Sequence, residues 1–154
     1  MVPMRERFAV EIPSGGAALE ADRWLGEGAP VVLVHSGVSD RRGWEDVAER
    51  LNSAGCSVVA YDMRGFGGSP PTDGAFSHMD DLIAVLEGLD LKKAWIVGSS
   101  LGGGVALDAA LVASKRMSGL VLIAPAVSGA PRAHHLDANT GSLVQLLEAA
   151  DARR

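Results

Sequence analysis

The chain has 154 residues, of which 47% are hydrophobic and 21% charged, and its formal net charge is −5. This is enough for one soluble globular domain with its own core. The negative charge argues against nucleic acid as a partner, because phosphate binding needs a surplus of lysine and arginine on one face. The single cysteine, Cys56, excludes an internal disulfide. We interpret it as a small core residue rather than a catalytic thiol.

The sequence shows no targeting or membrane segment. Residues 1–7 carry charges but are followed by no apolar run of the kind that a signal peptide needs. No apolar stretch approaches the roughly 18 residues of a membrane span. We therefore expect a cytoplasmic protein that does not bind membranes.

Buried strands alternate with amphipathic helices along most of the chain. The β-branched run at 31–34 is typical of a strand covered on both faces, as in a parallel sheet. Ser77 is placed to cap a helix whose apolar stripe runs from Met79 to Leu89. The predicted strands are 8–12, 18–25, 31–34, 58–61, 94–97 and 120–123, and the predicted helices are 44–54, 77–89, 100–113 and one near the end in which Ser142 and Gln145 form a capping box. This order predicts the α/β class, as a three-layer α/β/α fold with a mostly parallel sheet.

The most informative segment is Gly-Ser-Ser-Leu-Gly at 98–102, a G-x-S-x-G pattern with Ser100 at its centre. It lies between a predicted buried strand and a predicted helix, which is the context that a nucleophile elbow needs. Only glycine-sized neighbours fit beside such a turn, at Gly98 and Gly102. The turn exposes the serine hydroxyl, and the amide N–H of Leu101 at the start of the helix points to the space where an oxyanion forms.

This segment has two other interpretations. A serine in a glycine-rich turn is often only a helix cap. Gly98, Gly102 and Gly104 also match the G-x-x-x-G-x-G pattern of dinucleotide-binding short-chain dehydrogenases. Three features argue against a dinucleotide site. The motif lies late in the chain, no acidic residue follows the next strand, and Tyr61 is not part of a Tyr-x-x-x-Lys pair.

With these motifs the chain resembles the α/β-hydrolase superfamily over about residues 8–128. His-Ser-Gly-Val at 35–38 directly follows a strand and is similar to the family's oxyanion loop. Trp44 matches the aromatic residue at the start of the following helix. The run 62–69, Asp-Met-Arg-Gly-Phe-Gly-Gly-Ser, resembles the family's D-x-R-G-x-G-x-S turn, in which we interpret Asp62 and Arg64 as scaffold.

The resemblance implies a serine hydrolase in which Ser100 attacks a small ester or lactone. Its oxyanion hole would be formed by the N–H groups of Leu101 and Gly37, with Val38 as the alternative to Gly37. His35 and Ser36 would belong to the oxyanion loop, the histidine in a structural role. The chain resembles the esterase and lactonase branch of the family. We expect no cofactor or metal, because no metal-ligand spacing is present. Residues 1–128 would form the N-terminal part of the core, and 129–154 would begin a cap.

The acid and histidine of the family's triad would follow Ser100 in that order, but no residue after Ser100 matches them. Asp108 lies roughly 12 Å along the helix from Ser100, which is too far to orient a shared base. His134 and His135, which precede Asp137, stay open as an improvised site. We expect them, and His78, to be exposed. The acid position after strand 120–123 is occupied by Ala-Pro-Ala.

The absence of residues that match the triad acid and histidine affects both the expected assembly and the expected function. Strand 120–123 should form an apolar sheet edge, so we expect self-association or a complementing C-terminal segment. The leading hypothesis is a serine hydrolase whose base and acid come from elsewhere. The alternatives are a non-catalytic binding module that retains the pocket and, less favoured, a dinucleotide-binding domain.

Overall fold

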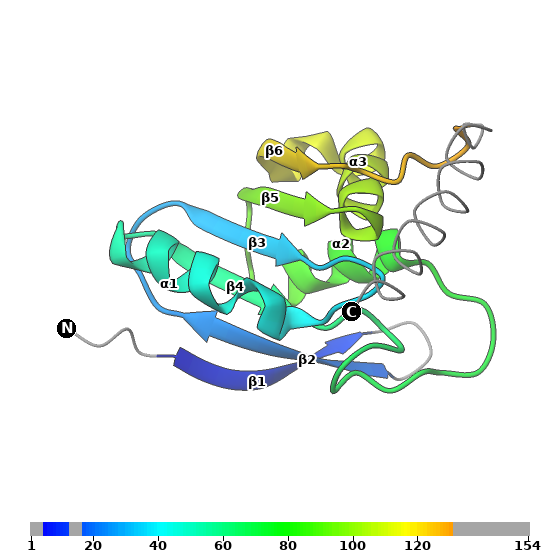
Figure 1. Cartoon of the computed structure of the whole chain (residues 1–154), viewed down its shortest axis with the longest axis horizontal. Helices are drawn as coiled ribbons and strands as arrows, with labels where there is room; N and C mark the ends of the chain where they lie inside the picture. The colour runs from blue at the N-terminus through cyan, green and yellow to red at the C-terminus, as the bar shows by residue number, and fades with distance from the viewer. Residues whose placement is uncertain (1–4, 13–16, 131–154) are drawn as a thin grey trace, which may run out of the picture.

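The computed structural model describes residues 5–12 and 17–130. A six-stranded sheet forms its centre, in the order β1-β2-β4-β3-β5-β6 (Figure 1). The β1–β2 and β2–β4 pairs are antiparallel, and the three other pairs are parallel. The strands are β1 (Arg5–Ile12), β2 (Ala17–Trp24), β3 (Pro30–Val34), β4 (Ser57–Tyr61), β5 (Ala94–Ser99) and β6 (Met117–Ile123). The predicted α/β class with a mostly parallel sheet is confirmed.

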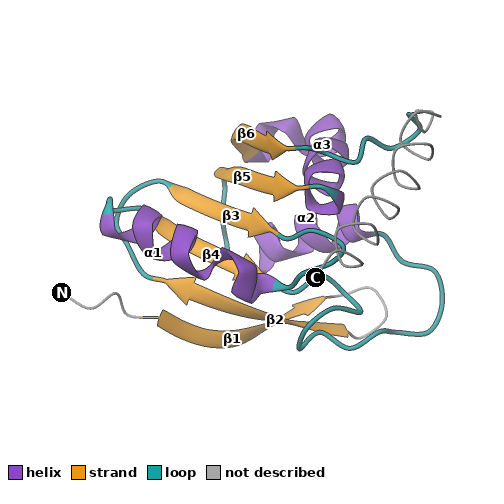
Figure 2. Ribbon diagram, viewed as in Figure 1, coloured by secondary structure: helices purple, strands orange, loops and turns teal. Residues whose placement is uncertain are grey.

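Helices cover both faces of this sheet, which gives three layers (Figure 2). The helix α1 (Glu45–Ser53) follows a short 3-10 turn, η2 (Arg41–Trp44), and lies on one face. The helices α2 (His78–Gly88) and α3 (Leu101–Ala113) lie on the other face and pack against each other. A second 3-10 turn, η3 (Ser114–Arg116), leads from α3 into β6. Ser77 caps α2 as predicted, because its hydroxyl accepts a hydrogen bond from the Asp80 N–H.

The alternation of side chains along each strand divides the core into two clusters. On β3, Val32 and Val34 face the α2 and α3 side, where they join Leu82, Val85 and Leu86. Val31 and Leu33 face the other side and pack with Trp44 and Ala48 of the η2–α1 segment. The continuous apolar run of β3 therefore reflects burial on both faces, as its composition predicted.

Strand β6 begins three residues earlier than the apolar run suggested. Met117 and Gly119 pair with Ala94 and Trp95, and a Cβ atom at Gly119 would overlap the Trp95 ring in its present position. A sequence window that looks for branched apolar residues misses this start, since the glycine provides space for the neighbouring tryptophan.

Strand β6 forms the edge of the sheet in the described part of the chain, as predicted. The face of β5 and β6 opposite α3 is the less covered one. Trp95, Val121 and Ile123 are 42%, 45% and 47% exposed there. Large apolar side chains at an open edge are an aggregation liability unless another segment covers them.

Several predictions fall outside the described residues. They concern the turn at 13–16, the capped last helix, His134, His135, and the boundary between a core at 1–128 and a cap at 129–154, most of which lies in 131–154. Those assignments stay predictions. Within 5–12 and 17–130, none of the helices is long and apolar enough to cross a membrane.

Candidate active site

The loops that follow β3, β4, β5 and β6 gather at one end of the sheet. Parallel strands place their carboxyl ends at the same edge, which is where ligands bind in open α/β sheets. His35 follows β3, Asp62 follows β4, Ser100 follows β5 and Ala124 follows β6. The motifs singled out in the sequence therefore meet at one edge.

Ser100 has a strained backbone and an exposed side chain. Its φ is 51° and its ψ is −113°, a conformation that a residue with a side chain rarely adopts. Its N–H donates to the Ile123 carbonyl at 2.9 Å, and its own carbonyl accepts from the N–H groups of Gly104 at 3.1 Å and Ala126 at 2.9 Å. Three hydrogen bonds thus hold the residue in place. Such strain, maintained by the surroundings, is found mainly at functional sites.

The glycines on either side of Ser100 allow the backbones to approach closely. A Cβ atom on Gly98 would overlap the carbonyl of Gly102. A Cβ atom on Gly102 would overlap the carbonyl oxygens of Val34 and His35 at the end of β3. Both glycines therefore have the steric role that the G-x-S-x-G pattern predicted, and Gly102 also lets α3 start directly beside the loop after β3.

The loop after β3 lies beside the first residue of α3. A Cβ atom on Gly37 would lie 3.4 Å from Leu101 Cδ2, so the two residues predicted to supply oxyanion donors are neighbours. The loop closes on itself, because the Ser39 N–H donates to the Ser36 carbonyl at 3.2 Å and the two hydroxyls lie 3.0 Å apart. Val38, the alternative to Gly37, has a side chain that is 97% exposed.

His35 connects this loop to the turn after β4. It is fully buried; its Nδ1–H donates to the Ser36 carbonyl at 2.7 Å, and its Nε2 accepts from the Met63 N–H at 3.0 Å. One nitrogen donates and the other accepts, so the ring is a neutral imidazole. Burial lowers the pKa of His35, partly offset by the Ser36 carbonyl and the Asp62 charge. These contacts are those of a structural residue.

We expect the free energy of unfolding to fall as the pH drops below about 6.5. The unfolded chain binds a proton at His35 near the ordinary value of 6.5, and the folded chain binds it only at lower pH. Stability is therefore full above 6.5 and is lost below it, with a slope of at most about 1.4 kcal/mol per pH unit for one group. Urea unfolding between pH 5 and 8 measures this slope.

The matched variant is His35→Gln, whose side-chain oxygen can still accept from the Met63 N–H. Its slope should be shallower than that of the unmodified protein. A slope remains, because burial also lowers the pKa of His78. Equal slopes for the two proteins would contradict the assignment of this pH dependence to His35.

Asp62 is the centre of a buried ionic network. Its carboxylate accepts from the Arg41 N–H at 2.7 Å, from the Arg41 guanidinium, and from the Gly68 N–H at 2.8 Å. The same guanidinium lies 3.0 Å from Asp22 and 2.5 Å from Glu20. The sequence pattern does not reveal Arg41, because Asp40, Arg41 and Arg42 have the composition of a solvated loop.

Arg64 is held in the same way on the other side of the turn. Its guanidinium donates to both Asp81 oxygens, at 3.0 and 2.6 Å, and to Thr72 at 2.7 Å, and it lies 4.7 Å from the centre of the Phe76 ring. Both ions of the Arg64–Asp81 pair are buried. These contacts support the interpretation of Asp62 and Arg64 as scaffold.

The expectation that His78 is exposed was wrong. It is half-buried, with ring centres 5.0 Å from Phe76 and 6.1 Å from Phe66. Burial lowers the pKa of His78. The position of His78 in the first turn of a helix suggested exposure. The two aromatic residues that bury it come from the loop before α2, and the sequence pattern does not reveal the path of that loop.

No candidate for a complete triad or a metal centre appears in the described part of the chain. Asp108 lies two turns along α3 and is hydrogen-bonded to the Ser128 hydroxyl at 2.6 Å. Within 5–12 and 17–130, no three histidine, cysteine or acidic side chains are grouped to hold a metal ion.

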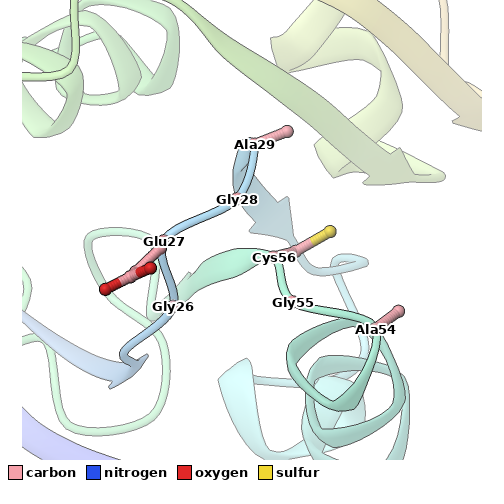
Figure 3. Close-up of a pocket in the computed structure, with 7 residues that line it drawn as sticks. All are labelled: Gly26, Glu27, Gly28, Ala29, Ala54, Gly55 and Cys56. Carbon is pink, nitrogen blue, oxygen red and sulfur yellow. The ribbon is translucent and has the colours of Figure 1, made fainter.

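A separate hollow lies at the opposite end of the sheet, before β3 and β4. It is formed where the segment 26–29 passes the segment 54–56, and the Gly28 N–H donates to the Gly55 carbonyl at 2.8 Å. Figure 3 shows the Cys56 thiol pointing away from the Glu27 carboxylate. Half-buried Cys56 packs at the edge of the core, so this hollow is a packing feature with no link to Ser100.

Comparisons with known proteins agree with this geometry. Residues 29–150 match the family model described as alpha/beta hydrolase fold. A 2-hydroxymuconate semialdehyde hydrolase of Pseudomonas sp. (strain CF600) is 35% identical over 123 residues, which is 75% of this chain and 43% of that protein. The chain thus spans less than half the length of this relative.

Solved structures show the same partial coverage. An esterase from Exiguobacterium antarcticum superposes with a TM-score of 0.72 at 26% identity, covering 79% of this chain and 46% of the other. Est816, described as an N-acyl homoserine lactone degrading enzyme, gives a TM-score of 0.70 at 29% identity, covering 77% and 45%. The match over residues 29–150 includes the loop at 35–38, the turn at Asp62 and the turn at Ser100, and on this basis the chain belongs to the alpha/beta hydrolase fold family.

Proposed function

We propose that this chain carries the nucleophile and oxyanion hole of a serine hydrolase that acts on a small ester or lactone. The Ser100 hydroxyl attacks the carbonyl carbon and forms a tetrahedral intermediate. The N–H groups of Leu101 and Gly37 stabilise its oxyanion. The alcohol leaves, and water hydrolyses the acyl-serine that remains.

The observation that supports this proposal best is the backbone of Ser100. A helix-capping serine has no need of a φ of 51°, whereas a nucleophile elbow requires such a turn. The first N–H groups of α3 have no acceptor within the helix, and a helix N-terminus favours negative charge. The neighbouring Gly37 and Leu101 fit a shared oxyanion site. The names of the esterase and of the lactone-degrading enzyme support an ester or lactone as the substrate class.

The proposal includes a general base from outside the described residues. A serine hydroxyl is a weak nucleophile without such a base. The base and its acid would come from His134, His135 and Asp137, from a complementing segment, or from a second copy of the chain at the β6 edge. Alanine substitution at His134 and His135, alone and together, separates the first source from the other two.

Hydrolysis of p-nitrophenyl acetate tests the nucleophile. We expect an acetyl adduct on Ser100 by mass spectrometry, and a fall of about 100-fold or more in nitrophenolate release for Ser100→Ala. Ser53→Ala, a serine on the exposed face of α1, is the matched control and should behave like the unmodified protein. The oligomeric state is recorded in the same samples.

Equal rates for Ser100→Ala and the unmodified protein would contradict nucleophilic catalysis by this chain. That outcome would favour the second candidate, a binding module that retains the oxyanion site for a carbonyl or small anion. The neighbouring Gly37 and Leu101 would then still bind such a ligand. Titration with a non-hydrolysable carbonyl compound would detect this binding.

A further inference from the structure

A cleft runs along α3 from Leu101, the residue after Ser100, towards the middle of the helix. Leu101, Gly104, Val105 and Asp108 line it, at positions i, i+3, i+4 and i+7 of the helix, so they form one stripe. Its other walls are the start of α2 and the loop after β6, through Ser77, His78, Met79, Ala126 and Ser128. The cavity volume is about 210 Å³, below the roughly 300–1,000 Å³ of common ligand pockets. Only a small group fits.

The two ends of the cleft differ in chemistry. Leu101, at the inner end, directly follows Ser100 and is the proposed oxyanion donor. Asp108, at the outer end, lies seven residues further on, about 10 Å along the helix axis. It accepts a hydrogen bond from the Ser128 hydroxyl at 2.6 Å. Val105 and Met79 give the space between the ends an apolar lining.

The charges in the cleft favour a cation at the outer end. No lysine or arginine is among the residues that line it, whereas Asp108 supplies a carboxylate. The cationic Arg64, which acts on His78, is paired with Asp81. His78 adds a neutral polar group, because burial lowers its pKa, and its buried Nδ1 has no hydrogen-bond partner among the described residues. A carboxylate-bearing chain would find no cation here.

From this arrangement we propose that the cleft between α2, α3 and the loop after β6 binds the acyl chain of the substrate, and that Asp108 selects chains with a positively charged end. This inference rests on the proposed function, since the acyl carbonyl must lie beside Ser100. The chain would run along α3 from the oxyanion site, with its apolar middle against Val105 and its charge beside Asp108.

Three p-nitrophenyl esters of matched shape test the selection. One carries a 4-(trimethylammonio)butanoyl group, the second its neutral isostere, 5,5-dimethylhexanoyl, and the third an anionic 4-sulfobutanoyl group. The measured quantity is the rate of Ser100 acylation, followed by nitrophenolate release and intact mass. We expect the cationic ester to react about fivefold faster than its isostere, because a partly exposed ion pair contributes only a small interaction energy. The anionic ester should react slowest.

Asp108→Asn removes the charge but keeps the shape and the hydrogen bond to Ser128. In this variant the cationic and neutral esters should react at nearly equal rates. Asp46→Asn makes the same change on the exposed face of α1 and should retain the fivefold ratio. A ratio near one in the unmodified protein, or an unchanged ratio in Asp108→Asn, overturns the role of Asp108.

A binding measurement separates this inference from the proposed function. If no ester acylates Ser100 in the folded protein, the proposed function fails. The cleft is still tested by titrating 4-(trimethylammonio)butanamide, and its neutral isostere 5,5-dimethylhexanamide, into ¹⁵N-labelled protein. Amide shifts at Val105 and Asp108 that are larger for the cation, and that weaken in Asp108→Asn, support the cleft. The absence of shifts at millimolar concentration overturns it.

Discussion

Replacing Gly102 by alanine is expected to lower the free energy of unfolding by about 3 kcal/mol. The new Cβ atom would overlap the carbonyl oxygens of Val34 and His35. Both are backbone atoms at the end of a buried strand, so neither can rotate away as a side chain would. Helix α3 would have to move from the sheet, and the three hydrogen bonds that hold Ser100 would be distorted with it.

Urea unfolding followed by circular dichroism measures the loss. Gly43→Ala is the matched control, because a Cβ atom there would meet the Ser39 side chain at an ordinary 3.8 Å. It should change stability by no more than about 0.5 kcal/mol. A Gly102→Ala variant as stable as Gly43→Ala would mean that the close approach of α3 to β3 is not needed for the fold.

This expectation shows why the elbow could be predicted from the sequence. Gly98, Ser100 and Gly102 are close together in the chain, and the close contact between Gly98 and Gly102 is local, although Gly102 also packs against the distant end of β3. In a strained turn of this kind between a strand and a helix, only glycine fits at the positions two before and two after the serine. The parallel strands were predictable for a similar reason, since burial on both faces leaves a continuous apolar run such as 31–34.

The residues that the sequence did not reveal act through contacts between distant segments. Arg41 meets Asp22 and Asp62, which lie about twenty residues away on either side, and nothing in the run Asp40-Arg41-Arg42 distinguishes a buried arginine from a solvated one. The buried position of His78 depends in the same way on the path of the loop that carries Phe76. Such pairings follow from the fold and appear only once the strands are placed.

In the candidate site, too, the local motifs were predictable from the sequence and the contacts between distant segments were not. The sequence pattern predicted Ser100 and the loop at 35–38 as separate motifs, but the closeness of Gly37 to Leu101 depends on β3 and β5 being neighbours in the sheet. The cleft that leads to Asp108 required the placement of α2 and of the loop after β6. From the sequence alone, Asp108 is only a residue too far along the helix from Ser100 to serve in a triad.

Asp62→Ala is expected to be the most destabilising change outside the glycines, at about 3–5 kcal/mol. The carboxylate is fully buried, and its removal leaves the N–H groups of Arg41 and Gly68 without their acceptor. It also removes one of the carboxylates that compensate the buried Arg41 guanidinium. A buried charge that loses its partner costs more free energy than the intact ion pair contributes to stability.

If the loop at 35–38 serves as proposed, the loss extends to the chemistry, because Met63, the next residue, donates its N–H to the His35 ring of that loop. Acylation of Ser100 by p-nitrophenyl acetate should therefore slow in Asp62→Ala even at temperatures where it stays folded. Asp40→Asn is the matched control: its exposed pair with Arg42 should be worth less than about 1 kcal/mol, and asparagine can still cap the turn at η2. If Asp62→Ala unfolds at the same urea concentration as Asp40→Asn, the buried network does not hold the loop at 35–38, and the geometry beside Ser100 depends instead on the close packing at Gly102 and the hydrogen bonds of Ser100.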